Sequence, residues 1–497
     1  MMDPLMIARV AVARTDGRYP VGAPFSPQEA YPECPFPADP SGAPNPAYAA
    51  VRLALRQLEL DPSRFGTPAW NPLRELIQPG QTVLLKPNLI REDRWGRPGE
   101  WEQIITHGAV IRAVMDYVSI ALAGRGRMIV ADGPQTDSDF ELICRRLQLR
   151  EVTALYQARG LTVDLIDLRR DRWYMRGDVI EWRETLPGDP AGYTEIDLGA
   201  ASAFAGYGLN GRFYGADYDI DETARFHSGG RHVYILCRSP LLADVVINLP
   251  KLKTHKKTGI TLSLKNLVGI NGYRNCLPHH TLGTPGDGGD EFSASTGAHR
   301  LQSRGTQTFK RLLVAARGNG GAWARLVKRL GRGVFGDTAH VVRSGNWHGN
   351  DTAWRMVLDL NRAFFHFDAA GQRRATPRGY LTLVDGIVAG EGNGPMEADA
   401  CPAGLVAAGF NALAVDTVCA LVMGFDPDRL PLLREGWRAA ELPLAQFGPE
   451  DVRCASNVEG WNGGLADLMR GPSLDFRPHF GWRGHIERAA LAGATEG

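Results

Sequence analysis

The sequence predicts an α/β fold in which a mostly parallel sheet carries helices on both faces, with two lobes around a crevice and irregular insertions. Two observations predict this class. Between residues 81 and 167, short apolar runs alternate with helically spaced apolar residues, which is typical of βαβ units. Residues 244–249 form a nearly unbroken apolar run, which suits a strand buried on both faces of a parallel sheet.

The individual elements follow from periodicity along the chain. Residues 5–14 alternate like a strand, 46–60 have helical spacing, and the proline-rich stretch 19–45 between them is expected to be a surface loop. Further strands are expected at 82–85, 127–131, 162–167, 244–249, 379–385 and 404–409, and helices at 107–122, 142–159, 350–365 and 411–423. Residues 170–230 break this rhythm and are expected to form an insertion of irregular or hairpin structure.

This alternation divides the chain into four expected segments. Residues 1–80 would pack on the main unit, 81–280 would form a first α/β lobe, and 346–497 a second lobe with a tail. Between the lobes, 281–345 would provide a lid and a basic insertion, because 281–299 is rich in glycine and small polar residues.

The basic insertion is defined by its charge. Residues 300–343 contain ten lysines or arginines against one acid, Asp337. Such a run predicts a solvated helix face, and a subunit contact or a docking patch for an anionic partner is the alternative. The sequence leaves the oligomeric state open.

Composition limits the classes of protein that the chain can be. With 497 residues, 44% of them apolar and 22% charged, it forms a globular core. A net charge of +1 argues against nucleic-acid binding. No apolar stretch is long enough for a membrane span, and the first residues lack the apolar region of a secretory signal.

The cysteines indicate the compartment. There are seven, scattered and without a CxxC pair, which favours a reducing, cytoplasmic environment and no iron–sulfur cluster.

Basic residues follow the apolar strand at 244–249. In an extended chain Lys251, Lys253 and His255 share one face, because side chains alternate along a strand. Open α/β sheets bind ligands beyond the carboxyl ends of their strands. Three aligned cations would repel one another without an anion between them, so the pattern predicts an anion site; a solvated basic loop is the alternative.

Three more expected strands also run directly into polar groups. Lys86 and Asn88 follow the strand expected at 82–85, Asp132 follows the strand at 127–131, and Asp385 ends the strand at 379–385. In a parallel sheet all four endings open on one edge and describe a binding crevice. The predicted ligand-binding residues are therefore Lys86, Asn88, Asp132, Lys251, Lys253, Lys265, Asn266, Asp385 and Asn393.

Two residues are candidates for catalysis. His255 is the preferred acid–base group, because surrounding lysines would lower its pKa and favour a neutral base. Glu391 lies in the glycine-rich stretch 390–395, and would serve as a base or a metal ligand. A plain tight turn explains that stretch equally well.

Metal binding is a separate possibility. His279 and His280, with His255 and Glu391 or Asp385, could supply nitrogen and oxygen ligands to a divalent ion, but their spacing matches no standard zinc signature. No particular cofactor is identified by the sequence.

Taken in order, these motifs resemble the uncharacterised domain-of-unknown-function family 362. The matching pieces are VLLKPNL (83–89), TH (106–107), VADGP (130–134), ADVVINLPKLKTH (243–255), KNLVG (265–269), the pair 279–280, LVDGIVAGEGNGP (383–395) and ALAVDTVCALVMGFDP (412–427). Some relatives in that family carry a fused ferredoxin module; this chain lacks one, so the resemblance implies no redox chemistry. The basic insertion lies outside the shared pattern.

A weaker likeness is to the amino-terminal domain of the lactate racemase family, the nickel-pincer enzymes. It implies a proton-transfer base at His255, a cofactor-binding lysine at Lys265 and a nickel ligand at His280. A shared fold would place all three in one pocket, with the chain bent near Gly259. The sequence departs from that pattern where Asp132 and Gly133 stand in place of a second catalytic histidine.

The sequence therefore predicts an enzyme that acts on a small phosphate- or carboxylate-bearing molecule by acid–base chemistry at a strand-end crevice. The alternatives are a racemase-like isomerase with a nickel-pincer cofactor, and a non-catalytic module that binds an anionic metabolite. Nickel analysis and an absorbance scan for a bound chromophore distinguish the first alternative, and turnover in a metabolite pool would exclude the second.

Overall fold

The computed structural model describes residues 7–39, 45–176, 179–208, 212–217, 219–315 and 341–488. Its centre is a large mixed sheet with the strand order β18-β17-β1-β16-β14-β10-β2-β3-β4. The strands are β1 (Arg9–Arg14), β2 (Thr82–Pro87), β3 (Arg127–Asp132), β4 (Thr162–Asp167), β10 (Val245–Leu249), β14 (Gly379–Asn393), β16 (Leu405–Gly409), β17 (Arg453–Ser456) and β18 (Gly463–Gly464).

The middle of this sheet is parallel, as the sequence predicts. β14, β10, β2, β3 and β4 pair in parallel, so their carboxyl ends meet at one edge. Strands from both predicted lobes lie in this one sheet, and β16 and β1 extend it with antiparallel pairings. The predicted polar endings after β2, β3 and β10 therefore share an edge, whereas Asp385 lies inside β14, which continues to Asn393 instead of ending at 385.

Helices cover both faces of the sheet, which confirms the fold class. Along β2, Val83 and Leu85 pack into one core and Leu84 into the other, because successive side chains point to opposite faces. The first core contains α2 (Pro46–Gln57), α3 (Gly108–Leu122), α4 (Phe140–Arg146) and α5 (Leu149–Gln157). The second contains α11 (Ala353–His366), α12 (Ala412–Met423), α13 (Pro431–Gly436) and α14 (Leu465–Arg470).

One helix boundary differs from the prediction. The single helix expected at 142–159 is two helices, α4 and α5, and Gln148 between them has a φ of 51°. A residue in the left-handed region ends an α-helix, and hydrophobic periodicity does not report it.

The stretch 170–230 is an insertion, as expected. It contains the hairpin of β5 (Asp171–Arg176) and β6 (Val179–Thr185), and then β7 (Tyr193–Asp197), β8 (Phe213–Tyr214) and α6 (Ile220–Phe226). β7 pairs with β9 (Val233–Cys237), and β8 pairs with β13 (His280–Thr281).

The glycine-rich stretch is partly packed. The buried Asp290 accepts hydrogen bonds from Thr281 N and Thr352 Oγ1, and Glu291 accepts from Ser303 Oγ. Residues 285–288 and 293–298 are exposed, so a lid, if present, is confined to part of the predicted segment.

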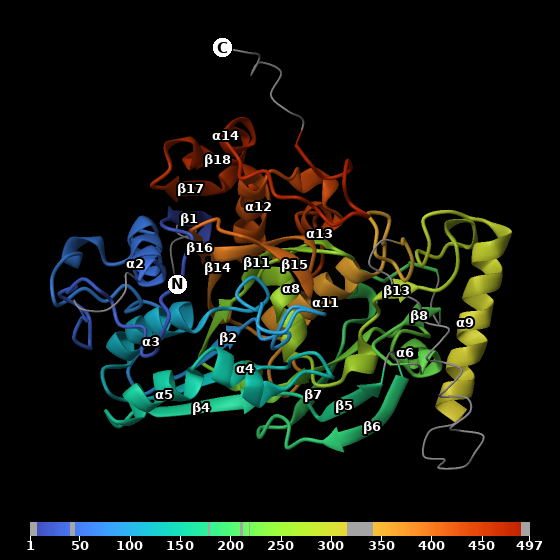
Figure 1. Ribbon diagram of the computed structural model, residues 1–497, viewed down its shortest axis with the longest axis horizontal. Coiled ribbons are helices and arrows are strands. Elements are labelled where there is room, and N and C mark those ends of the chain that lie inside the picture. Colours follow the sequence, from blue (N-terminus) through green and yellow to red (C-terminus); the bar gives the residue numbers. More distant parts are fainter. Residues whose placement is uncertain are drawn as a thin grey trace.

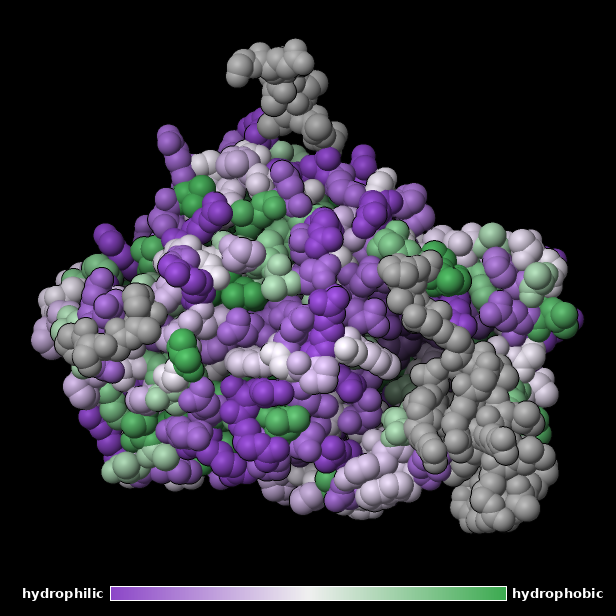
Figure 2. All heavy atoms as spheres, viewed as in Figure 1, coloured by the Kyte–Doolittle hydropathy of each residue, from purple (hydrophilic) through white to green (hydrophobic). Residues whose placement is uncertain are grey.

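The basic insertion begins as a helix. α9 (Gly297–Ala315) forms its first part, and residues 316–340 lie outside the described residues. Figure 1 shows α9 at the end of the molecule opposite α2, beside β8, β13 and α6. The face in Figure 2 is largely hydrophilic, with hydrophobic residues in small separate groups. Within the described ranges, no helix is long and apolar enough to cross a bilayer.

Candidate functional site

A small pocket, with a cavity volume of about 60 Å³, lies at the carboxyl edge of the parallel strands. It is here called the lysine pocket, and its walls come from the ends of β2 and β3, from β11 (Lys251–His255) and β12 (Gly259–Thr261), and from the short helix α8 (Ser263–Asn266). The lining residues are Lys86, Asn88, Ile90, Asp132, Gly133, Lys253, His255, Thr261, Lys265, Asn266, Val268, Gly269, Arg274 and Pro395. Seven of the residues predicted from the sequence meet here: Lys86, Asn88, Asp132, Lys253, His255, Lys265 and Asn266.

A buried ion pair forms the floor of the pocket. Lys86 Nζ lies 2.5 Å from Asp132 Oδ1, and Asp132 also accepts hydrogen bonds from Leu89 N and Gly133 N. Gly269 covers this pair, and a Cβ there would lie 1.9 Å from Asp132 Oδ1. Only glycine permits that approach. Burial lowers the pKa of Lys86, and Asp132 opposes this shift.

The remaining cations of the pocket have no carboxylate at ion-pair distance among the described residues. Lys253 Nζ donates to Ile104 O at 2.6 Å and to Asn88 Oδ1 at 3.4 Å. Burial, followed by the charges of Lys251 and Lys265, holds the pKa of Lys253 well below its ordinary value. Arg274 donates to the carbonyls of Gly133 and Pro134.

Lys265 differs from the other lysines of the pocket in its exposure and in its pKa. Its side chain is partly exposed at the pocket, and it makes no ion pair within the described part of the chain. Burial, and then the charges of Arg274 and Lys86, lower the pKa of Lys265 to about 8. The amine therefore exchanges a proton near neutral pH.

The charge of this pocket is unbalanced. Lys86, Lys253, Lys265 and Arg274 line it against a single carboxylate, that of Asp132. The hydroxyl of Thr261 also lines it, is buried, and has no hydrogen-bond partner. An anion would satisfy both the excess positive charge and the unpartnered hydroxyl.

The tautomer of His255 follows from its backbone contacts. Its Nδ1 accepts hydrogen bonds from Lys257 N at 3.0 Å and from Thr258 N at 3.2 Å. A neutral ring with Nδ1 as acceptor carries its proton on Nε2. Burial and the neighbouring lysines, Lys265 first, keep the pKa of His255 well below its ordinary value. The neutral ring therefore presents Nε2–H as a hydrogen-bond donor, and the acid–base role of His255 stays a prediction.

A support for α8 was missed by the sequence analysis. Asp416 on α12 accepts hydrogen bonds from Ser263 N at 2.8 Å and Leu264 N at 2.9 Å. Asn266 Nδ2 donates to Asn248 Oδ1 and to Lys86 O, which ties α8 to β10 and β2. Burial raises the pKa of Asp416 to about 7. Asp416 is the one acidic residue in the apolar stretch 412–423, and this position in the sequence could have indicated a buried acid.

Lys251 and Asp385 lie outside the lysine pocket, contrary to the expected row of three cations. Lys251 Nζ lies 3.1 Å from Asp385 Oδ2 and 2.7 Å from the hydroxyl of Tyr19, which donates to Asp385 Oδ1. Asp385 also accepts from His107 N. Between Lys251 and Lys253 the pairing with β14 shifts from Asp385 to Gly390, so the two lysines have different surroundings.

Glu391 and Asn393 also lie outside this pocket. Glu391 forms an ion pair with Arg477 at 2.8 Å. Asn393 lines a smaller neighbouring pocket with Lys256 and His479. The lining of the lysine pocket therefore gives no support to Glu391 as its base.

The two adjacent histidines do not line the lysine pocket either. His279 donates Nδ1–H to Leu277 O, and His280 Nδ1 lies 3.3 Å from Lys257 Nζ. In the described part of the chain, no three His, Cys, Asp or Glu side chains gather as metal ligands. The bend at Gly259, with a φ of 78°, is confirmed, and it brings His255 and Lys265 together without His280. Two of the three residues that the racemase likeness would place in one pocket, His255 and Lys265, therefore line it, and His280 does not.

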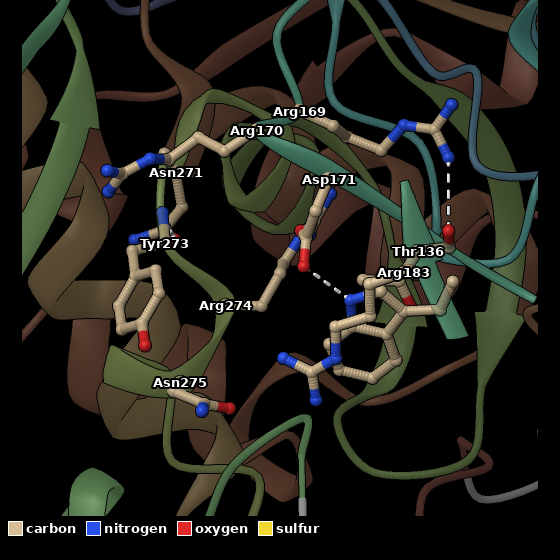
Figure 3. A pocket seen from close by; sticks show the side chains of 11 residues that line it. Thr136, Arg169, Arg170, Asp171, Arg183, Asn271, Tyr273, Arg274 and Asn275 are labelled. Carbon is tan, nitrogen blue, oxygen red and sulfur yellow. Dashed lines mark hydrogen bonds between the residues drawn. The ribbon is translucent and has the colours of Figure 1, made fainter. Parts of the chain in front are cut away.

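An arginine-lined pocket with a cavity volume of about 30 Å³ adjoins the lysine pocket through their shared residue Arg274. In Figure 3, Arg169 turns toward Thr136, and Arg170 extends beside Asn271 and Tyr273. Arg169 and Arg183 have carboxylate partners, Asp167 and Asp217. Two of the four arginines of this pocket are thus paired with carboxylates, and a third, Arg170, lies over the ring of Tyr193.

Lysine usage was a signal that the sequence analysis missed. The chain contains 56 lysines and arginines, and only eight of them are lysines. Seven of the eight lie at the lysine pocket or near it, and the eighth, Lys328, is outside the described residues. The members are Lys86, Lys251, Lys253, Lys256, Lys257, Lys265 and Lys310. Arginine supplies the positive charge elsewhere, and lysine is concentrated where an amine can titrate.

Comparison with known proteins gives two findings. Residues 188–421 match the family model described as Domain of unknown function (DUF362). The thylakoid-associated protein sll1697 of Synechocystis sp. (strain ATCC 27184 / PCC 6803 / Kazusa) is 24% identical over 382 residues, which cover 76% of this chain and 75% of that protein. The family match confirms the resemblance found in the motifs, and it contains β11, β12 and α8.

Proposed function

We propose, from the premise that residues 188–421 belong to the DUF362 family, that the lysine pocket binds a small phosphate- or carboxylate-bearing molecule and performs acid–base chemistry on it. The observation that carries this proposal is the imbalance of four cations against one carboxylate, in a pocket that also presents an unpartnered hydroxyl. Buried charges are normally paired, so the missing partner is a bound anion.

The binding roles follow from the contacts. Lys253 and Arg274 are held in place by backbone carbonyls, and they present hydrogen-bond donors to the anion, whose negative charge favours the protonated form of Lys253. Thr261 donates its hydroxyl hydrogen. Lys86 is already neutralised by Asp132, and this pair supports the pocket floor.

Proton transfer is assigned to His255 and Lys265. The Nε2–H of His255 donates to an oxygen that gains negative charge during the reaction. Lys265, with its pKa lowered to about 8, is partly neutral at physiological pH and accepts a proton as its neutral amine. Both groups line the same pocket, so one ligand contacts them together.

Calorimetric titration tests anion binding. Inorganic phosphate or malonate should bind saturably to the wild-type protein, and Lys265→Met should weaken binding by about 1.5–3 kcal/mol, the range for a hydrogen bond to a charged group. Arg438→Gln is the control, because its side chain is 68% exposed and far along the chain from the pocket residues. Equal affinity of the Lys265→Met variant and the wild type would exclude the lysine pocket as the binding site.

Turnover separates an enzyme from a binding module. A metabolite extract incubated with the wild-type protein should lose a substrate, as followed by mass spectrometry. His255→Phe should abolish this loss, and His255→Gln, which keeps a donor, should retain part of it. Saturable binding without turnover would identify a metabolite-binding module instead.

We also infer a cytoplasmic location, because all seven cysteines are free. The Synechocystis relative is named as thylakoid-associated. Cell fractionation distinguishes the two locations: recovery of this protein in the membrane fraction would overturn the inference.

A further inference from the structure

A second group of basic side chains lies beside the lysine pocket. Lys257 follows β11, His280 and Tyr214 are directly paired residues of β13 and β8, and Lys310 is on α9. These four residues are here called the outer cluster. Figure 1 shows β8, β13 and α9 next to one another.

The members of the outer cluster form a continuous chain of contacts. Lys257 Nζ lies 3.3 Å from His280 Nδ1, the rings of His280 and Tyr214 are 4.9 Å apart, and Lys310 Nζ lies 3.6 Å from the centre of the Tyr214 ring. His280 is 1% exposed and Lys310 is 6% exposed. The cluster is therefore an interior feature, although two of its members are lysines.

One hydrogen-bond donor in this cluster has no acceptor. Nδ1 of His280 accepts a hydrogen bond from Lys257 Nζ when Lys257 is charged, and the ring proton is then on Nε2. That Nε2 is buried and has no partner. Buried polar groups are normally satisfied, so this donor points to a group that binds there.

The charge of the outer cluster is also uncompensated at short range. Among the described residues, no carboxylate lies at ion-pair distance from Lys257 or Lys310. Asp290 and Glu291 are near enough to affect these lysines, yet their oxygens accept hydrogen bonds from other groups, such as Thr352 Oγ1 and Ser303 Oγ. The outer cluster, with two lysines, thus has an excess of basic groups, as the lysine pocket does.

The two groups of cations adjoin each other. Lys257 N donates to His255 Nδ1, so the two side chains start from one turn. After burial, the charges of neighbouring lysines, Lys265 among them, lower the pKa of Lys257. Burial and then the charges of Lys257 and Lys265 lower the pKa of His279, so these three side chains are close to one another. A ligand in the lysine pocket therefore has a second cationic site within its surroundings.

We propose that the outer cluster binds a second anionic group of the same ligand, so that the ligand carries two anionic groups, such as two phosphates or a phosphate and a carboxylate. The inference rests on the proposed function of the lysine pocket. Lys257 and Lys310 pair with the second group, and the Nε2–H of His280 donates to it.

Titration with a series of probes tests the proposal. Inorganic phosphate serves as the single anion; pyrophosphate, tripolyphosphate and 1,6-hexanediol bisphosphate serve as double anions of increasing length. At least one double anion should bind to the wild-type protein tenfold or more tightly than phosphate. Lys310→Met and Lys257→Met should remove this advantage and leave the affinity for phosphate unchanged.

Two controls separate binding from folding. Lys310→Arg keeps the charge over the Tyr214 ring, so it should keep the advantage of the double anion. Each variant should unfold at a temperature close to that of the wild type. If Lys310→Met unfolds at a clearly lower temperature, the tighter binding of the double anion is compared between Lys310→Arg, which should keep it, and Lys257→Met, which should lose it.

The outcomes distinguish this inference from the proposed function. If phosphate binds in a Lys265-dependent manner but no double anion binds more tightly, the outer cluster is structural and the inference is wrong. An advantage that survives both Lys310→Met and Lys257→Met would also overturn it. If phosphate does not bind at all, the proposed function fails as well.

Discussion

Lys251 and Lys253 stand two residues apart on β11, and both amines are buried, yet they belong to different kinds of site. Lys251 is enclosed with Asp385 and Tyr19, and every charge in that group has a partner. Lys253 bonds only to a carbonyl and an amide oxygen, and it faces a pocket with three other cations. Compensation of charge therefore distinguishes the two lysines: Lys251 has a carboxylate partner, and Lys253 has none among the described residues, which is the basis for proposing that Lys253 binds a ligand.

Breaking the compensated pair should have the largest effect. Lys251→Met leaves the Asp385 carboxylate buried without its cation, so the free energy of unfolding should fall by about 3–5 kcal/mol. Urea denaturation followed by circular dichroism measures this. A loss below about 1 kcal/mol would show that Tyr19 and the His107 amide satisfy Asp385 on their own.

The support beneath the pocket should respond to pH. The pKa of Asp416 is raised from 3.8 to about 7, so the folded state favours the protonated acid. This contribution to stability is complete below pH 3.8 and is lost as the pH rises through 7.

Denaturation of the wild type and of Asp416→Asn at two pH values isolates this contribution. Between pH 5 and pH 8, the stability of the wild type relative to Asp416→Asn should fall by about 2–3 kcal/mol. An unchanged difference would mean that the Ser263 and Leu264 amides hold Asp416 ionised throughout.

Replacing Lys253, which has no carboxylate partner among the described residues, should affect ligand affinity more than stability, the opposite of the effect expected at Lys251. Lys253→Met takes a buried cation out of a cationic pocket, so the free energy of unfolding should change by less than about 1 kcal/mol, whereas phosphate affinity should fall by roughly 1.5–3 kcal/mol. Calorimetry and urea denaturation on the same preparation measure both. Strong destabilisation with unchanged affinity would place Lys253 with Lys251 as a structural residue.

The smallest expected effect is at the unpartnered hydroxyl. Thr261→Val should weaken phosphate binding by about 1 kcal/mol and leave stability unchanged, because no hydrogen bond of the free protein is lost. Thr258→Val is the matched control: its hydroxyl donates to Ile260 O, so this variant should lose stability and keep its affinity. Identical behaviour of the two variants would remove Thr261 from the binding site.

Much of the fold was predictable because the strands are long apolar runs and each ends in a polar group. The same rule found the pocket residues at the ends of β2 and β3, and the bend at Gly259 brought Lys265 to them. Pairing partners were harder to predict. Alternation placed Lys251 and Lys253 on one face, but the shift in pairing from Asp385 to Gly390 gave them different environments, and no local pattern encodes such a shift.

The histidines illustrate the same limit. His255 was recognised from its place after the lysines, but the direction of its proton depends on the amides of Lys257 and Thr258, which are positioned by the turn. Asp416 was part of a recognised motif, yet its role depends on a contact more than 150 residues away along the chain, with Ser263 at a separation of 153.

Because the chain contains only eight lysines, their amines can serve as spectroscopic probes of the region around the lysine pocket. Reductive methylation with ¹³C-formaldehyde would label primary amines alone, so an NMR spectrum would contain signals from at most eight lysines and the terminal amine. Most of them report on one region, and their methyl shifts would follow each proton as the pH changes. The arginine-rich surface is silent in this experiment, so the lysines that the reagent reaches, such as the partly exposed Lys257 and Lys265, can be titrated without mutagenesis.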